Sequence, residues 1–513
     1  MATGARVLLI GLDSADPLVV RQLVAAGRMP AVASLLANGA WCEVQAPPGV
    51  YTAAIWPSIA TGLSPAGHGR YCDEQLVVGT YRCSHFGPAD MGGKPFWESL
   101  GEAGHRVAVV DVPHTALSRG LNGIQVMGWG GCAADQEFGT WPPSYAGDLR
   151  ERWGAHPVGW DCGRAGDGAA EWARLRDKLV TAVQARAAMA GSILSSEAWD
   201  FVFYVFTEAH CAGHNCWHLH DPSHPRYMSQ LAATVGADPV AAVYEELDRA
   251  IGNIIEQAGD DAICALLLSH GMGPSYTGNH LLDQVLARFE GRSTGVAQRS
   301  DHGFRATALR RLPRPARQAA RLVRRSVFPS KDPLVLNDRQ LASQDAFALR
   351  QNTCGAVRVN LRSREPAGRV SRENYDEYCT ELSNQLLEVV NVGTGRPVVK
   401  SVIKSADVFT GARLDGLPDL VVEWDASEPI SEVTSPRIGT VKGDNPDHRS
   451  GDHRPTGLLV VTGPGTRPGY LGAPVQATDI APTIASLFGA RLPASDGRVF
   501  PLVAGGPTAV RSG

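Results

Sequence analysis

Long hydrophobic runs and an excess of charge of one sign are both missing from this chain of 513 residues. No apolar run reaches the roughly 18 residues that indicate a membrane-spanning helix. The net charge is only −4 at pH 7, so the chain has no bulk electrostatic attraction for nucleic acid or for a lipid surface. We therefore expect neither a transmembrane segment nor a nucleic-acid partner.

Cysteine is scarce, with ten residues in the whole chain. The apolar run near the N-terminus covers only residues 7–10, which is shorter than the apolar region of an export signal. Sparse cysteines without an export signal are typical of reduced thiols rather than of a disulfide framework. We expect a cytoplasmic protein in which Cys211 and Cys216 are reduced.

What the chain does contain is the composition of a folded globular protein, with 44% hydrophobic and 19% charged residues. Short, mostly apolar runs alternate with helical stretches, which indicates an α/β fold with a mainly parallel sheet covered on both faces. The expected strands are 6–11, 106–112, 201–206, 262–268, 356–361, 420–424 and 458–462, and examples of expected helices are 17–25, 94–104 and 375–390.

Two segments interrupt this alternation, at about 130–195 and 274–350. We interpret both as cap or lid segments inserted into a single catalytic domain that spans residues 1–513. The second segment carries nine basic residues between Phe304 and Lys331. Such a stretch is typical of a solvated lid helix, a phosphate-attracting rim or a membrane-surface helix, and the sequence leaves the role of 305–331 open.

Carboxylate and imidazole groups follow the ends of several expected strands. Asp13 follows the first strand, His210 and His214 follow the third, and His270 follows the fourth. His453 comes shortly before the last strand. Ligands gather at the carboxyl edge of an open parallel sheet, and a metal site needs such groups from distant positions on rigid elements.

Each of these residues also has an ordinary structural explanation. Asp13 alone is typical of a helix cap, and His270 alone is typical of a turn. His210 and His214 are four residues apart, a spacing that places both on one helical face with or without a metal. The combination at one sheet edge is what favours a metal site.

A stretch from Pro47 to Gly69 carries a further pattern. Thr52 lies nine residues before Thr61, and the following motif is Thr61-Gly62, Pro65 and His68-Gly69. This stretch resembles the nucleophile region of the alkaline phosphatase superfamily, in its type I phosphodiesterase/nucleotide pyrophosphatase branch. The resemblance extends along most of the chain through Gly11-Leu12-Asp13, residues 357–368, Pro418-Asp419-Leu420, residues 479–483 and Asp496-Gly497-Arg498.

The resemblance implies an alkaline-phosphatase-like three-layer α/β/α sandwich, a two-metal phosphoester site and Thr52 as the catalytic nucleophile. One metal would be held by Asp13, Thr52 and His270, and the other by His210, His214 and His453. The chain departs from the family pattern at two ligand positions. The Asp expected before His270 is Ser269, and the Asp expected four residues before His214 is His210.

These departures change the metal chemistry. The three-histidine set is neutral and rich in nitrogen, which suits zinc better than magnesium or manganese. The set around Asp13 should hold a second metal more weakly, manganese included, or recruit Glu208 or Asp452. We expect His68 and His218 to lie behind the ligands or against the substrate.

The sequence thus predicts a metal-dependent hydrolase of a small phosphorylated substrate, acting through a phosphothreonine at Thr52. Branch resemblance favours a phosphodiesterase or pyrophosphatase over a monoesterase. Alternatives are a catalytically silent phosphoryl-binding protein and a hydrolase of a related ester, such as a phosphonate or a sulfate. A sulfatase is disfavoured because its nucleophile derives from Cys or Ser, and this position is Thr52. The sequence predicts neither the leaving group nor the oligomeric state.

Overall fold

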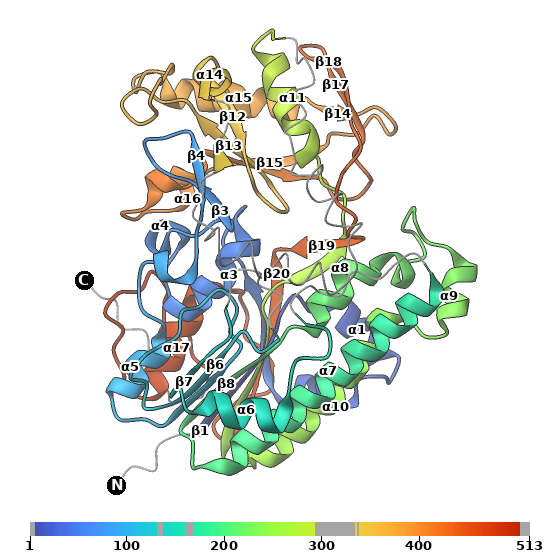
Figure 1. The fold of residues 1–513 in the computed structure, drawn as a ribbon, viewed down its shortest axis with the longest axis vertical. Coiled ribbons are helices and arrows are strands. Elements are labelled where there is room, and N and C mark those ends of the chain that lie inside the picture. Colours follow the sequence, from blue (N-terminus) through green and yellow to red (C-terminus); the bar gives the residue numbers. More distant parts are fainter. Residues whose placement is uncertain (1–5, 131–136, 160–167, 293–333, 336–337, 503–513) are drawn as a thin grey trace.

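The computed structural model describes residues 6–130, 137–159, 168–292, 334–335 and 338–502. The chain forms two stacked lobes (Figure 1). The larger lobe is built around the central sheet. The smaller one, here called the cap lobe, comprises helix α11 (Asn279–Phe289) and residues 338–442. The basic segment 305–331 lies outside the described residues.

The central sheet has parallel strands in its middle and antiparallel strands toward its edges. Its order is β21-β2-β20-β9-β1-β8-β5-β6-β7, and β22 also pairs with β2. The five neighbours from β9 to β6 run parallel. The bounds are β1 Arg6–Leu12, β2 Ala40–Gln45, β5 Val107–Val110, β6 Gly123–Met127, β7 Gly139–Trp141, β8 Phe201–Phe206, β9 Ala262–Leu268, β20 Thr456–Thr462, β21 Gly469–Tyr470 and β22 Val475–Gln476.

Strand β1 shows why the sheet is covered on both faces. Successive side chains of a strand point to opposite faces. Leu8 and Ile10 are buried in one core cluster, and Val7 and Leu9 are buried in another. The first cluster involves α1 (Pro17–Ala25), α2 (Pro30–Asn38), α6 (Tyr145–Trp153), α7 (Ala169–Ser196), α8 (Glu208–His220) and α10 (Pro239–Ala258), and the second involves α3 (Tyr51–Thr61), α4 (Pro65–His68), α5 (Phe96–Glu102) and α17 (Ile480–Leu487). The predicted α/β fold with a mainly parallel, doubly covered sheet is confirmed.

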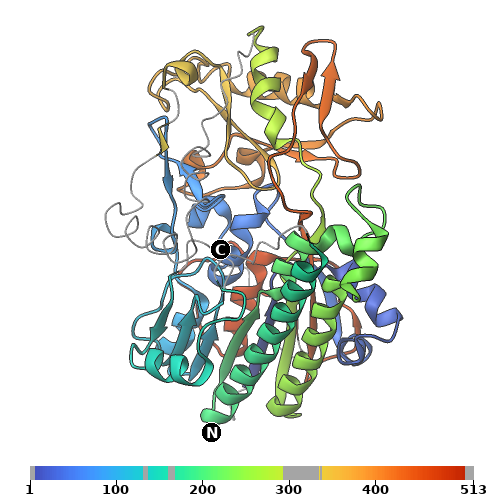
Figure 2. The same cartoon turned by 45° about the vertical axis from the view of Figure 1, so that its right-hand side comes forward.

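Helices α7 and α10 lie side by side along the length of the sheet (Figure 2). The sequence analysis assigned most of α7 to an inserted cap segment at 130–195. Its Leu179 and Val183 are instead buried in the same core cluster as Leu8 of β1. The described part of that segment therefore belongs to a layer of the main lobe, because an amphipathic helix buries its apolar face on the nearest sheet.

The cap lobe contains a separate antiparallel sheet of order β12-β13-β16-β15. Two of its strands, β13 and β16, were predicted to belong to the central sheet, and that prediction is wrong. A short apolar run fits any strand buried on both faces, so the pattern does not say which sheet it joins. The cap is consequently larger than the predicted segment 274–350, of which only the described part can be placed.

The cap lobe also has a three-stranded sheet, β14-β17-β18, and its own hydrophobic core. Its remaining elements are β12 Ala346–Leu349, β13 Gly355–Val359, β14 Val390–Asn391, β15 Val399–Lys404, β16 Leu420–Trp424, β17 Glu432–Ser435, β18 Gly439–Lys442, α14 Asp338–Ala342, α15 Tyr375–Leu387, α16 Ser405–Val408 and the 3₁₀ helix Leu414–Gly416.

Short ribbons and turns complete the main lobe. Strand β20 runs antiparallel to β9, not parallel as predicted. In the described part of the chain no single helix is long and apolar enough to span a membrane, and α1 with α2 passes that test only as a pair bent by 101°. The other elements are β3 Glu74–Leu76, β4 Arg82–His85, β10 Gly271–Pro274, β11 Leu334–Val335, β19 Gly451–Arg454, α9 Ser229–Val235 and the 3₁₀ helices Pro88–Asp90 and Ala477–Asp479.

Candidate active site

The ends of three adjacent parallel strands bring the predicted site residues together. Strand β1 lies between β8 and β9, so the segments that follow these strands leave the sheet at one edge. The backbone continues this order for one more residue, because Asp13 N–H donates to the Phe206 carbonyl at 2.8 Å and Ser269 N–H donates to the Leu12 carbonyl at 3.1 Å. Asp13, the start of α8 and Ser269-His270 therefore converge.

Three histidines form a compact cluster at this edge. His210 and His214 lie one turn apart on α8, and His453 lies on β19, which pairs with β10 beside the end of β9. The Nε2 atom of His214 is 3.1 Å from the Nε2 atom of His210 and 3.1 Å from that of His453. Ligand nitrogens of the three residues all lie within 4.8 Å of one another, close enough to bind one metal ion.

The hydrogen bonds of the cluster indicate which nitrogens carry lone pairs. His214 Nδ1 is 2.8 Å from the Gly451 carbonyl oxygen, so this nitrogen carries the hydrogen and donates it. The lone pair on His214 Nε2 then faces the Nε2 atoms of the other two rings. His210 Nδ1 is buried without a hydrogen-bond partner in the described structure. These nitrogens fit a cation better than they fit one another.

Burial keeps these rings neutral. It lowers the pKa of His214 and of His453 well below the ordinary histidine value. Burial also lowers the pKa of His210, and the nearby charge of Asp13 partly offsets that effect. Neutral imidazole is the form that binds metal, so the cluster requires no deprotonation at neutral pH.

The residues of the other predicted metal set have protein partners. Asp13 Oδ1 accepts a hydrogen bond of 2.7 Å from Trp56 Nε1. Burial lowers the pKa of His270 to about 4, and Asp13 acts in the opposite direction. The ring of His270 is hydrogen-bonded at both nitrogens, to Ser269 on one side and to Ser14 and His453 on the other.

Thr52 lies in the first turn of α3 and is half-buried. Its Oγ1 is 3.0 Å from Thr353 Oγ1, and Thr353 comes from the loop between β12 and β13 of the cap lobe. Thr353 Oγ1 in turn donates to Asp452 Oδ1 at 3.0 Å, and the same carboxylate oxygen accepts the His453 backbone N–H at 2.8 Å. Asp452 thus links the Thr52 hydroxyl to the histidine cluster through two hydrogen bonds.

Glu208 lies away from the ligand atoms, in a buried ionic network. Its Oε1 accepts from Arg186 Nε at 2.7 Å and lies 2.9 Å from His156 Nε2. Burial alone would raise the pKa of Glu208, but the charge of Arg186 and the His156 hydrogen bond outweigh it and lower the pKa to about 2. Arg186 also binds Asp111 at 2.8 Å. Glu208 therefore anchors the first turn of α8.

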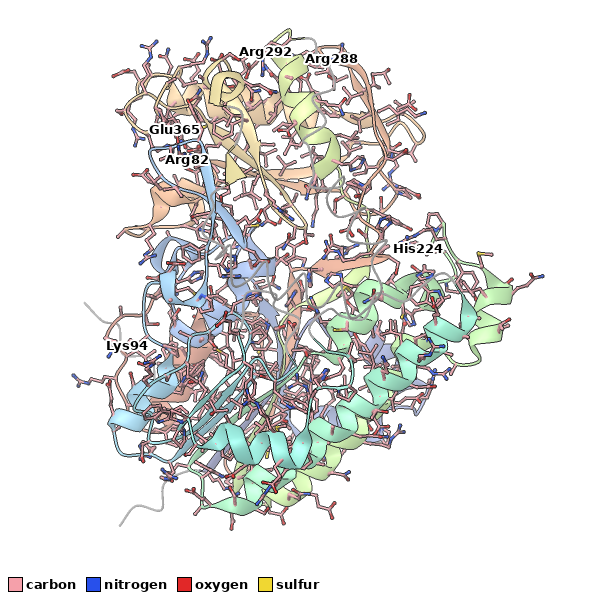
Figure 3. All side chains as sticks on the ribbon, in the orientation of Figure 1. Arg82, Lys94, His224, Arg288, Arg292 and Glu365 are labelled. Carbon is pink, nitrogen blue, oxygen red and sulfur yellow. The ribbon has the colours of Figure 1, made fainter. Side chains whose placement is uncertain are left out.

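Two other predicted residues lie behind or beside the cluster. His68 is fully buried, with Nε2 3.1 Å from Ser58 Oγ of α3, and burial lowers its pKa to about 3. His218 lies one turn beyond His214 on α8, edge-on to Trp172 at a ring distance of 5.0 Å. His224 follows in the loop between α8 and α9 (Figure 3).

The sequence analysis missed several partners of the site. Ser14, Trp56 and Thr353 contact predicted residues as described above, but no motif singles them out. Arg449 NH1 lies 3.4 Å from His214 Nε2, at the outer limit of a hydrogen bond, and Asp447 holds the same guanidinium. Its position four residues before His453 was the only available signal.

The cysteines on α8 differ from each other. Cys216 is a buried thiol, as predicted. Cys211 is disulfide-bonded, so the expectation that it is reduced is wrong. Sequence spacing alone does not reveal which cysteines approach each other in space.

The described fold and site define an α/β protein with a candidate metal centre and a threonine hydroxyl at the carboxyl edge of its sheet. This chain belongs to the type I phosphodiesterase/nucleotide pyrophosphatase family, whose sequence model matches residues 7–427. The family is a branch of the alkaline phosphatase superfamily, as predicted. A search of curated proteins gives no match.

Solved structures with a similar fold include two hydrolase-type proteins. One is phosphonoacetate hydrolase from Sinorhizobium meliloti 1021 in complex with phosphonoacetate, at 14% identity, a TM-score of 0.49 and coverage of 93% of this chain and 94% of that chain. The other is murine ectonucleotide pyrophosphatase/phosphodiesterase 5, an inactive form in complex with AMP, at 11% identity, a TM-score of 0.48 and coverage of 96% and 97%. The family assignment depends on the match over residues 7–427, not on these similarities.

Proposed function

We propose that this protein hydrolyses phosphoric esters with Thr52 as the nucleophile. A divalent metal at His210, His214 and His453 assists the reaction. The observation that supports this most is the convergence of three Nε2 atoms at the sheet edge where the family places its phosphoester site.

Zinc is the metal that this donor set favours. Three neutral imidazoles suit zinc better than magnesium or manganese, and a catalytic zinc has three protein ligands with one position open. When bound there, the metal supplies positive charge for the oxygens of the phosphoryl group. The predicted second metal, at Asp13, Thr52 and His270, is a separate question because these residues already have protein partners.

The neighbours of Thr52 orient its hydroxyl group. Thr353 uses its hydrogen to bind Asp452, so Thr353 Oγ1 is left as an acceptor for the Thr52 hydroxyl. The Thr52 hydrogen then points to the cap lobe, and a lone pair on Oγ1 is free to face a phosphorus atom. The first-turn N–H groups of α3 favour a negatively charged phosphoryl group beside Thr52.

The reaction then takes two displacements. Thr52 Oγ1 attacks phosphorus, and the bond to the leaving oxygen breaks, which yields a phosphothreonine. Overall, the hydroxyl proton departs with the leaving alcohol or phosphate. Water next attacks the phosphothreonine, releases the second product and restores the hydroxyl of Thr52.

Arg449 is placed to assist substrate binding. Its guanidinium reaches the edge of the histidine cluster, and Asp447 and the loop around it hold it there. Arg226 from the loop after α8 supports that loop by donating to the carbonyl oxygens of His448 and Arg449 at 3.1 and 2.8 Å. A guanidinium at this distance from the cluster suits an oxygen of a phosphoryl group.

The family favours a diester or a pyrophosphate over a monoester, and the substrate is a small phosphorylated molecule. A second candidate function follows from the two missing carboxylates at His210 and Ser269. Losing that negative charge weakens the metal centre, which favours a phosphoryl-binding protein without turnover.

Hydrolysis assays with the Thr52 variants test the proposal. Zinc-loaded and manganese-loaded protein is assayed with bis-p-nitrophenyl phosphate and with p-nitrophenyl phosphate. We expect the diester to be cleaved faster, and Thr52→Ala to lower turnover at least about 1,000-fold, as loss of a nucleophile does. Thr52→Ser should keep partial activity because the oxygen remains.

The controls are the circular dichroism spectrum and the zinc content of each variant, both of which should match the unmodified protein. Undiminished turnover in Thr52→Ala would exclude Thr52 as the nucleophile. Binding of inorganic phosphate without hydrolysis of any ester in the panel would support the binding protein instead.

A further inference from the structure

His270 is buried, with 1% of its surface exposed, and both of its ring nitrogens contact protein atoms. Nδ1 lies 2.8 Å from Ser269 Oγ. Nε2 lies 2.9 Å from Ser14 Oγ and 2.9 Å from Nδ1 of His453. Ser14 Oγ is also 3.0 Å from that same His453 Nδ1. His270 therefore lies directly behind a ligand of the three-histidine cluster.

The direction of these hydrogen bonds follows from the cluster. If His453 Nε2 offers its lone pair to a metal, the hydrogen of this neutral ring is on Nδ1. That hydrogen has two acceptors within 3.0 Å, His270 Nε2 and Ser14 Oγ. His270 accepts at Nε2 when its own hydrogen is on Nδ1 and is donated to Ser269 Oγ. The chain Ser269–His270–His453 is then fully satisfied without a second metal.

The other donors of the predicted second set fit a metal poorly. One carboxylate oxygen of Asp13 is bound to Trp56, and the Thr52 hydroxyl is bound to Thr353. The position where the family carries a carboxylate is Ser269, and its hydroxyl lies between His270 and the Leu12 carbonyl. What is left is one carboxylate oxygen, which is too little for a divalent cation that prefers several charged or oxygen ligands.

We propose that His270 is a positioning residue that orients His453, not a ligand, and that the chain binds one metal ion instead of two. The inference rests on the proposed function in that it takes the three histidines as the metal site. Metal-binding histidines usually donate their second nitrogen to a fixed acceptor, and loss of such an acceptor lowers metal affinity by about 10- to 100-fold.

Metal counting tests this directly. Purified full-length protein is incubated with excess zinc and then freed of unbound zinc, and zinc per chain is measured by atomic emission. We expect one zinc in the unmodified protein. His270→Ala should still bind one zinc at saturation, with affinity about 10- to 100-fold lower. His270→Gln should recover part of that loss, because its amide oxygen can accept from His453.

A cobalt-substituted sample gives a second readout. The visible absorption per bound cobalt should be kept in His270→Ala, because the three ligands are unchanged, whereas His214→Ala should bind no cobalt. Two zinc ions in the unmodified protein, with one lost in His270→Ala, would overturn the proposal, and so would no zinc at all. Because stoichiometry is measured without substrate, one zinc without ester hydrolysis would contradict only the proposed function, and two zinc ions with hydrolysis would contradict only this inference.

Discussion

At the residue scale, the site depends on the orientation of a few imidazole rings. His214 is held at Nδ1 by the Gly451 carbonyl, and His453 is held at Nδ1 by His270 and Ser14. Both rings therefore present Nε2 to the same point. Buried, neutral and pre-oriented nitrogens lose little on binding a cation, because neither protonation nor rotamer freedom has to be overcome.

His214 should be indispensable for metal binding, since its Nε2 atom is the one that approaches both other rings. We predict that His214→Ala purifies without zinc and that its zinc affinity is lost in a competition titration with a chromogenic chelator. His218→Ala is the matched control, one turn further along α8, where the ring packs on Trp172. Equal zinc content in the two variants would exclude the three-histidine site.

The sequence identified the candidate ligands because a metal site uses residue types that stand out at strand ends. It did not identify Ser14, Trp56 or Thr353. Serine, threonine and tryptophan have many roles, and their use here depends on rings and hydroxyls brought from other parts of the chain. Glu208 shows the opposite case, a carboxylate next to the site in sequence that an arginine buried on another helix holds elsewhere.

At the element scale, the site depends on the close approach of α8 and β19. A Cβ added to Gly451 would lie 2.3 Å from the carbonyl oxygen of Gly213, which is backbone of α8 and cannot rotate away. The same Gly451 carbonyl accepts the hydrogen bond from His214. Glycine at this position therefore sets both the distance between the elements and the orientation of a ligand.

Gly451→Ala should separate the two elements. We predict a loss of about 1–3 kcal/mol in the free energy of unfolding, as for other overpacked sites, together with weaker zinc binding. Gly147→Ala on α6 is the control, because no atom lies within 4 Å of its added Cβ. Urea denaturation with zinc titration checks both effects, and unchanged zinc affinity in Gly451→Ala would contradict the role given to this contact.

The elements themselves were largely predictable, whereas their assignment to sheets was not. The four buried strands 6–11, 106–112, 201–206 and 262–268 were found by their apolar runs and do lie in the central sheet. Strands of the cap lobe carry the same signal, since β13 is buried along its whole length. Only long-range pairing distinguishes the two sheets, and periodicity carries no information on pairing.

At the scale of the whole molecule, the cap lobe contributes directly to the site. Figure 1 shows this lobe above the edge of the central sheet near which α3, α8 and β19 lie. Thr353 from the loop between β12 and β13 contacts Thr52 of the main lobe and Asp452 before β20. The orientation of the nucleophile thus depends on the cap lobe being in place.

Removing the Thr353 hydroxyl should therefore affect turnover more than binding. We predict that Thr353→Val lowers kcat by about 10- to 100-fold, the effect of a small misplacement of a reacting group, with KM nearly unchanged. Thr353→Ser should restore most of kcat because it keeps the oxygen. A change confined to KM, or no rescue by serine, would argue against orientation of Thr52 by the cap lobe.

The central claim is that phosphoryl transfer passes through Thr52, and the stereochemistry at phosphorus tests it most directly. Each in-line displacement inverts phosphorus, so two displacements retain its configuration and one inverts it. The measurement is hydrolysis, in oxygen-labelled water, of a phosphorothioate diester of known configuration, with the product configuration then determined. We predict retention. Inversion would show direct attack by water and would contradict a phosphothreonine intermediate.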